Sequence, residues 1–302
     1  MIKKLYIGLV ACLVSFGNLF AQQDMMLTQE IFSRVNVNPA GIGNSNELDV
    51  FLHGRFQWAG VDNAPRTIVM NAMDYEEKLK SGFGLSVVYD KFGVGHSNTN
   101  IKIPYSYQLD LNEKTILSLG LAAGVNFGYF NFDENVVEEN VQYESELFAK
   151  EKNTKVKSDF DFGVELSQLH WTFGASVTHL LNNEAETQVF PRHLYLYGIG
   201  LVSISPKWDL SPTLCYIHRH QSNVLEVGCL GYYQQFLWGG FAWRPDVVES
   251  FGQSTLAITV GADWKYFRLG YSFDLGLGSL AGTFTNTHEL ILSFHMPKGK
   301  KK

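Results

Sequence analysis

The residues best suited to chemistry are the nine histidines and the serines near them, and their spacing forms no recognisable site. His218 and His220 are the closest histidine pair, but they flank Arg219 in a predicted loop and lack the spacing of metal ligands. A nucleophilic site needs a nucleophile, an adjacent base and a group that orients the base. Candidates without such an orienting group are Ser272, His288, Ser293 and His295. We therefore expect no enzyme, no cofactor and no metal.

A second chemical candidate is the acidic segment Asn131–Lys157, whose lysines cluster toward its end. Its acidic residues are Asp133, Glu134, Glu138, Glu139, Glu144, Glu146 and Glu151. Such a segment could dock a partner or hold a divalent ion, but its acids lack the regular spacing of a calcium-binding loop. We favour a solvated loop.

A third candidate is an ion pair between Asp263 and Arg268. Both belong to Ser254–Phe273, where apolar residues alternate with small or polar ones on either side of a two-residue turn, Lys265–Tyr266. Period-two alternation indicates strands with two different environments. Pairing across the turn sets Asp263 opposite Arg268 on the small, polar face. Buried charges need partners, so we predict a structural ion pair in an interior rather than a gate.

The same alternation recurs from Glu47 onward in about fourteen strand-length segments, near the middle of the range for outer-membrane barrels. The clearest others are Gly82–Asp90, Thr115–Tyr129, Asp159–Ser167, Trp171–Leu180, Leu194–Ser203 and Thr287–Met296. The mean hydropathy of −0.06 excludes a bundle of transmembrane helices. Because backbone groups in lipid must all be paired, an open sheet edge is excluded there. We therefore predict an all-β protein, a transmembrane antiparallel β-barrel with a polar lumen.

The predicted connections sort by length. The long ones are Asn131–Lys157, Leu181–Arg192, Arg244–Gly252 and Gly276–Asn286. The short ones are Asp110–Glu113, Gln168–His170, Ser205–Lys207 and Lys265–Tyr266. With both termini in the periplasm, the long connections all face outside, as is typical of bacterial barrels. Pro104 and Pro212 each remove a backbone donor, so we expect each at a strand end or bulge.

The N-terminus has the features of a secretory signal peptide, because Lys3 and Lys4 precede an apolar run and a small residue, Ala21. We expect cleavage after Ala21, and acylation at Cys12 is the alternative. The predicted organisation is a signal peptide over 1–21, an N-terminal periplasmic or plug extension over 22–46, an outer-membrane β-barrel over 47–296 and a basic C-terminal tail over 297–302.

Charge and cysteine content exclude further classes of protein. The net charge of −6 provides no basic stripe, so we expect no nucleic acid as a partner. Only Cys215 and Cys229 remain in the predicted mature chain, and an exported domain that relied on disulfides would have more. We expect both to be unpaired thiols.

Three stretches are not explained by strand periodicity: Gln29–Gly41, Arg55–Thr67 and Gly282–Phe294. The second contains the ordered pattern Gln-Trp-x-Gly-x-Asp-x-Ala-Pro-x-Thr. Together they resemble the PorP/SprF family of Bacteroidetes outer-membrane proteins, which is associated with the type IX secretion system. The signature residues, which are candidates for partner contact, are Asn38, Pro39, Gln57, Trp58, Asp62, Pro65, Arg66 and Thr67. The stretch Gln57–Thr67 could instead be a packed turn that plugs the barrel mouth.

The resemblance implies an integral outer-membrane component that supports export or cell-surface anchoring of cargo, such as adhesins for gliding motility. It implies partners among the periplasmic and lipoprotein components of the type IX machinery, and secreted cargo with a C-terminal sorting domain. One alternative is an outer-membrane transporter of hydrophobic small molecules with a plugged lumen, although the predicted polar lumen argues against it. Another is a diffusion porin, which would conduct ions.

Overall fold

The computed structural model describes residues 32–43, 47–93, 95–130, 155–181, 192–219, 222–247, 253–278 and 287–297. The strands are β1 (Glu47–Phe56), β2 (Arg66–Glu76), β3 (Ser81–Phe92), β4 (His96–Asn112), β5 (Thr115–Phe130), β6 (Lys155–Gln168), β7 (Trp171–Thr178), β8 (His193–Gly200), β9 (Val202–Ser205), β10 (Trp208–Arg219), β11 (Ser222–Tyr233), β12 (Leu237–Pro245), β13 (Gln253–Trp264), β14 (Phe267–Gly278) and β15 (Thr287–Pro297). The short 3-10 helices are η2 (Arg34–Asn36), η3 (Pro39–Gly41) and η4 (Glu77–Leu79). No helix among the described residues is long and apolar enough to cross a membrane.

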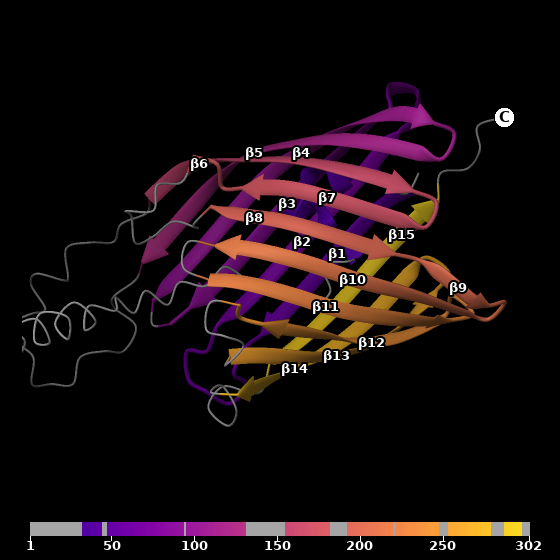
Figure 1. Cartoon of the computed structure of the whole chain (residues 1–302). Coiled ribbons are helices and arrows are strands. Elements are labelled where there is room, and N and C mark those ends of the chain that lie inside the picture. Colours follow the sequence, from indigo (N-terminus) through magenta and orange to yellow (C-terminus); the bar gives the residue numbers. More distant parts are fainter. Residues whose placement is uncertain are drawn as a thin grey trace, which may run out of the picture.

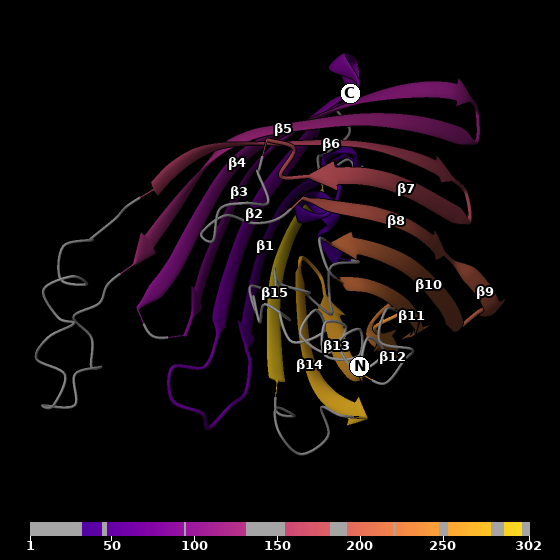
Figure 2. The same cartoon turned by 60° about the vertical axis from the view of Figure 1, so that its left-hand side comes forward.

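The strands close into one antiparallel barrel (Figures 1 and 2). β1 pairs with β2 on one side and with β15 on the other, and β10 pairs with β11. β8 and β9 both pair with β10 and form a single strand that is interrupted at Leu201, so the barrel has 14 strands. The predicted fold class and strand number are therefore confirmed. The predicted signal peptide, residues 131–154 of the acidic segment and the tail beyond Pro297 lie outside the described residues.

The hairpin of β13 and β14 has the predicted register. Trp264 pairs with Phe267, and Asp263 pairs with Arg268, so Lys265–Tyr266 forms the two-residue turn. Lys265 adopts a left-handed backbone conformation with φ of 55°, which a tight turn of this kind requires. Local alternation and turn length together fixed this pairing.

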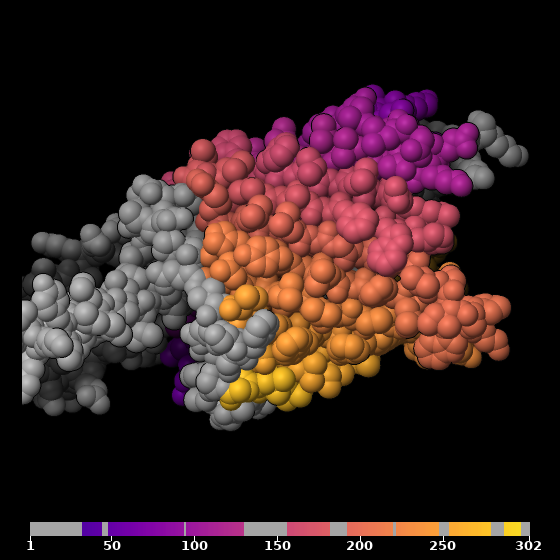
Figure 3. Space-filling view, in the orientation of Figure 1, coloured from indigo at the N-terminus to yellow at the C-terminus, as the bar shows by residue number. Residues whose placement is uncertain are grey.

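The two faces of the wall differ as the alternation predicts. On β13, Ile258 and Val260 are 49% and 54% exposed on the outside, whereas Ala257 and Thr259 are buried on the inside. One outer face of this wall is a continuous surface of side chains (Figure 3). Apolar residues outside and small or polar residues inside suit a barrel surrounded by lipid.

Short turns gather at one end of the barrel, beside the last strand's C-terminal end (Figure 1). They connect β4 to β5, β6 to β7, β9 to β10 and β13 to β14. Because bacterial barrels have their short turns in the periplasm, we refer to this as the periplasmic end and to the opposite one as the loop end.

The two prolines lie inside strands, which corrects the expectation that they occupy strand ends or bulges. Pro104 pairs with Ala122 of β5, and on its other side the β3–β4 register has no pairs between Phe83 and Ser86. Pro212 pairs with Cys229 of β11 and lies beside the interruption between β8 and β9. Each proline thus keeps one complete ladder and faces a gap in the other, where no N–H donor is needed.

The occupied lumen as candidate functional site

Residues 32–43, here called the inner segment, lie inside the barrel, where the strands surround their indigo coil (Figure 2). Asn38 and Ala40 are fully buried, although neither belongs to a strand. The local sequence explains the turn. Asn38 is the N-cap of η3, its Oδ1 atom accepts a hydrogen bond from the Ala40 N–H at 2.9 Å, and Pro39 occupies the first helical position.

A row of small residues across four strands receives this turn. Ser106 of β4 pairs with Gly120 of β5, Gly120 pairs with Gly163 of β6, and Gly163 pairs with Ser176 of β7. The Ser176 hydroxyl donates to the Val37 carbonyl at 2.6 Å, on one side of the turn. The Ser106 hydroxyl donates to the Ile42 carbonyl at 2.9 Å, on the other side.

The two glycines of this row are required by close approach. A Cβ atom at Gly120 would lie 2.0 Å from the Ala40 nitrogen, and one at Gly163 would lie 1.9 Å from Asn38 Oδ1. Neither distance is possible, so any side chain at these two positions would displace the turn. The wall and the inner segment are therefore complementary in shape as well as in hydrogen bonding.

Polar side chains fix the centre of the inner segment. Asn38 Nδ2 donates to the Val164 carbonyl and to Tyr197 Oη, both at 3.0 Å. Arg34 donates through Nε and Nη2 to the two oxygens of Glu165, at 3.1 and 3.2 Å. The Tyr197 hydroxyl donates to the same carboxylate. Burial lowers the pKa of Arg34, but Glu165 and Tyr197 more than offset this, so that the pKa lies above its usual value.

The first residue of the inner segment contacts the opposite wall. The Phe32 ring lies 4.6 Å from the Trp238 ring between centroids, and the Arg268 guanidinium lies 4.4 Å from the Phe32 centroid. Arg268 Nη2 lies 2.6 Å from Asp263 Oδ2, and Trp238 Nε1 donates to Asp263 at 3.0 Å. The predicted ion pair is thus present, and it supports the aromatic contact that holds Phe32.

The stretch Gln57–Thr67 lies at the loop end of the barrel, where it forms the connection from β1 to β2 and the first two residues of β2. The Gln57 N–H donates to the Pro65 carbonyl at 3.0 Å, and Trp58 has a positive φ of 50°. Asp62 and Arg66 are exposed and Val61 is 51% exposed, so the turn stands out from the barrel and is not packed in its mouth. The structure therefore separates the two signature stretches, since Asn38 and Pro39 are buried in the lumen.

Thr67 is the signature residue that joins this turn to the wall. It is buried, and its hydroxyl donates to Asp90 Oδ1 of β3 at 2.5 Å. Together with the hydrogen bond between Gln57 and Pro65, this contact anchors the base of the turn. The turn is consequently a shaped and fixed surface rather than an open loop.

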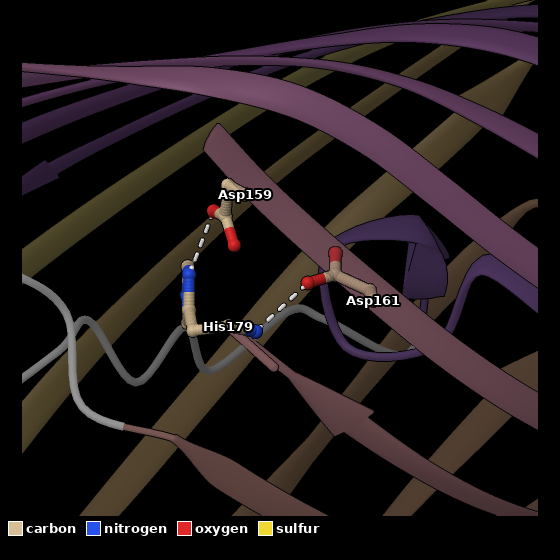
Figure 4. A group of neighbouring side chains, drawn as sticks. All are labelled: Asp159, Asp161 and His179. Atoms are coloured by element: carbon tan, nitrogen blue, oxygen red, sulfur yellow. Dashed lines mark hydrogen bonds and ion pairs between the residues drawn. The ribbon is translucent and has the colours of Figure 1, made fainter. Parts of the chain in front are cut away.

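Two charge networks between the inner segment and the loop end were not predicted. In the first, Lys102 Nζ lies 2.8 Å from Asp161 and 3.0 Å from Asp159, and His179 Nδ1 lies 2.7 Å from Asp159 (Figure 4). Lys102 reaches across β5 because its partner there is Gly124, which also pairs with Asp159. Alternation alone puts Lys102, Asp159 and Asp161 on the lumen face, and the glycine between their strands was the available signal.

The acids of this network could in principle hold a metal ion, since ligand atoms of Asp159, Asp161 and His179 lie within 4.8 Å of one another. Figure 4 shows the His179 ring pointing toward Asp159, while the backbone N–H of His179 donates to Asp161 at 3.0 Å. The Lys102 ammonium, however, already contacts both carboxylates. The geometry fits an internal cation supplied by the chain rather than a bound metal.

The second network lies on the opposite wall. Arg55 donates to Asp274 at 2.9 Å and also to Glu289, while His53 Nε2 lies 3.1 Å from Glu289. Arg244 extends it, with Nε 2.5 Å from Glu226 and Nη1 3.5 Å from Asp274. Charges of both signs thus line both walls, which makes this lumen polar.

Comparison with known proteins agrees with the architecture. No curated protein matches the sequence. Among solved structures, the TodX deltaS2S3 mutant monoaromatic hydrocarbon channel aligns with a TM-score of 0.53 at 10% identity, covering 91% of this chain and 95% of that chain. The CymD monoaromatic hydrocarbon channel aligns with a TM-score of 0.52 at 11% identity, covering 89% and 92%. The Acinetobacter baumannii outer membrane protein Omp33 aligns at 0.49 and 9% identity, covering 84% and 100%.

Identities this low show the fold alone, which is that of an outer-membrane β-barrel. A sequence model of the family described as type IX secretion system membrane protein PorP/SprF matches residues 19–294. This match covers all three stretches that carry the resemblance, Gln29–Gly41, Arg55–Thr67 and Gly282–Phe294, and every described strand except the end of β15. The protein is therefore an outer-membrane component of the type IX secretion system, associated with other components of that machinery, and it belongs to the PorP/SprF family.

Proposed function

We propose that this barrel supports the export or cell-surface anchoring of cargo by binding machinery and cargo at its two ends, without passing cargo through its lumen and without catalysing a reaction. The observation that carries this proposal is the occupied lumen. The inner segment crosses it and contacts strands on opposite walls, from Glu165 of β6 to Trp238 of β12. A polypeptide in transit would have to displace all of these contacts.

The closed wall supports the same reading. Among the described strands, β9 pairs only with β10, and each other strand pairs with a neighbour on both sides over at least part of its length, although β7 pairs with β6 only from Phe162 to Ser167. A lateral exit for cargo would require breaking a ladder whose backbone groups have no other partners in lipid. Binding at the exposed ends requires no such opening.

The turn between β1 and β2 is the contact surface that we propose for cargo. It presents Val61 and Asp62 to solvent, and hydrogen bonds from Val61 N–H to the Trp58 carbonyl and from Ala64 N–H to the Val61 carbonyl hold its shape. A fixed turn loses little conformational entropy on binding, which favours recognition. Its place at the loop end suits secreted cargo, whereas the periplasmic end suits the lipoprotein and periplasmic components of the machinery.

A test combines partner capture with surface display. The tagged full-length protein is crosslinked in its native outer membrane and purified in mild detergent, and its partners are identified by mass spectrometry. Val61→Glu should abolish recovery and display of the cargo while leaving recovery of the periplasmic components unchanged. Val61→Leu, which keeps an apolar side chain, is the matched control. Equal cargo recovery with both variants would exclude this turn as the cargo contact surface. A reproducible lack of any partner would contradict the proposed function.

The hydrocarbon transport named for two structural neighbours is not proposed for this chain. A pathway for apolar molecules needs an apolar lining, as in other small-molecule sites. Here the wall presents hydroxyls, amides and the two charge networks, and the inner segment fills the space between them.

A further inference from the structure

The wall of the lumen recognises the sequence of the inner segment. Gly120 and Gly163 accept only a chain that approaches as closely as the turn Asn38–Gly41 does. The wall also binds two specific side chains of the segment. The Val164 carbonyl and the Tyr197 hydroxyl accept hydrogen bonds from the Asn38 amide. The Glu165 carboxylate accepts two hydrogen bonds from Arg34. A segment with other residues at these positions would clash or leave buried groups unpaired.

The wall behind the inner segment is suited to water. Side chains of β2, β3 and β4 donate to it from Asn71, Ser86 and Gln108, in addition to the serines of the small-residue row. If the segment left, water would form hydrogen bonds with these polar groups, so that they would not remain unpaired. Barrels of about 8 strands are filled by their own side chains and those of 16–18 strands leave aqueous channels, so the 14-strand barrel lies between. Its lumen holds an additional stretch of chain.

Both ends of the inner segment lie toward the periplasmic end. Phe32 contacts Trp238 and Arg268, which are each the second residue of a strand that follows a short turn. At the other end, the Gly43 carbonyl accepts from Gln108, near the turn that joins β4 to β5. The segment is therefore an arch that rises into the lumen and returns on the same side.

We propose that the lumen contains a peptide-binding site for an Asn-Pro-Ala-Gly turn preceded by an arginine, that residues 32–43 occupy it as a tethered ligand, and that their release opens an aqueous passage. A peptide of the same kind, reaching the barrel from the periplasm, is the class of ligand that competes for the site. This goes beyond the proposed function, which requires only that the lumen is occupied.

The test measures ion conductance of the full-length protein in planar bilayers. The wild type should be closed. Arg34→Ala with Asn38→Ala weakens the tethered ligand and leaves the wall intact, so its open fraction should rise by more than the roughly 100-fold expected for Asn38→Ala alone, since the two Arg34–Glu165 hydrogen bonds are lost as well. A synthetic peptide of residues 32–43 should close this variant again, and only when added to the periplasmic side.

A second double variant changes the wall instead of the ligand. Gly120→Ala with Gly163→Ala should also open the barrel, but the peptide should not close it, because the added Cβ atoms occupy the place of the turn. Gly231→Ala is the control, since its Cβ would meet no atom closer than 3.5 Å and should leave the barrel closed.

The outcomes separate the proposal from its rivals. Ala40→Trp expels the turn by bulk and provides a second route to release should the first variant fail to fold. If every folded release variant stays as closed as the wild type, no latent passage exists. If the peptide closes neither variant, or closes both equally, the wall contains no specific site. A release variant that loses cargo display but conducts no ions would bear on the proposed function alone.

Discussion

Asn38→Ala should loosen the inner segment selectively. The side chain makes three hydrogen bonds, to the Ala40 N–H at 2.9 Å, to the Val164 carbonyl at 3.0 Å and to Tyr197 Oη at 3.0 Å. A buried hydrogen bond contributes about 0.5–1.5 kcal/mol net, so their loss should lower the free energy of local opening by about 3 kcal/mol. Because each 1.4 kcal/mol is a factor of ten, opening should become roughly 100-fold more frequent.

The assay is hydrogen–deuterium exchange by mass spectrometry on the purified barrel. Backbone amides of Asn38 and Gly41, which donate at 2.7 and 3.0 Å to carbonyls within the segment, should exchange about two orders of magnitude faster in the variant. Strand amides should remain protected, because the ladders do not involve Asn38. Asn100→Ala is the control, since Asn100 donates to Asp159 at 2.6 Å, in the charge network between the segment and the loop end.

Asn38→Asp sharpens the same test. Aspartate keeps the acceptor for Ala40 but loses both donors and adds a negative charge beside the Tyr197 hydroxyl, which already donates to Glu165. We expect faster exchange than in Asn38→Ala, because a buried charge without a partner is costlier than a missing amide. A change smaller than about threefold in either variant would refute the hydrogen-bond accounting.

Three further predictions concern the barrel itself. Lys102→Met should destabilise it by about 3–5 kcal/mol in chemical unfolding, because two buried carboxylates lose their cation; a neutral result would mean that these acids are protonated or solvated. Ile258→Lys should cost about 2–4 kcal/mol in lipid vesicles, as expected for a lipid-facing charge near the bilayer centre, whereas a change near zero would place this face in water. Thr67→Val should cost about 1–3 kcal/mol through the lost hydrogen bond to Asp90, and unchanged thermal unfolding would show that the bond contributes nothing.

The strands could be predicted from the sequence because their signal is local. The alternation around Lys265–Tyr266 predicts the register of β13 and β14, and the structure has those pairs. The exception is informative. Pro104 lies within a strand, because one neighbouring ladder is complete and only the other has a gap at that point. Which of two ladders is interrupted depends on three strands at once, and period-two patterns do not contain that information.

The lumen networks could be predicted only in part. Alternation assigns Lys102, Asp159 and Asp161 to the inner face, but their contact depends on β4 and β6 flanking the same residue, Gly124. The signature turn after Gln57 was recognisable by its pattern, yet its exposure at the loop end was left open until the structure placed it. Exposure of a turn depends on what packs against it, which is a property of the whole barrel.

By itself, the sequence determined a membrane barrel, because period-two alternation and short turns act between neighbours in the chain. Only the tertiary structure decided what the lumen holds. Arg34 meets Glu165 across 131 positions of sequence, and Asn38 meets Tyr197 across 159. Nothing local specifies such contacts. They exist because closure of the sheet brings distant strands around one narrow space, where two glycines leave room for a turn.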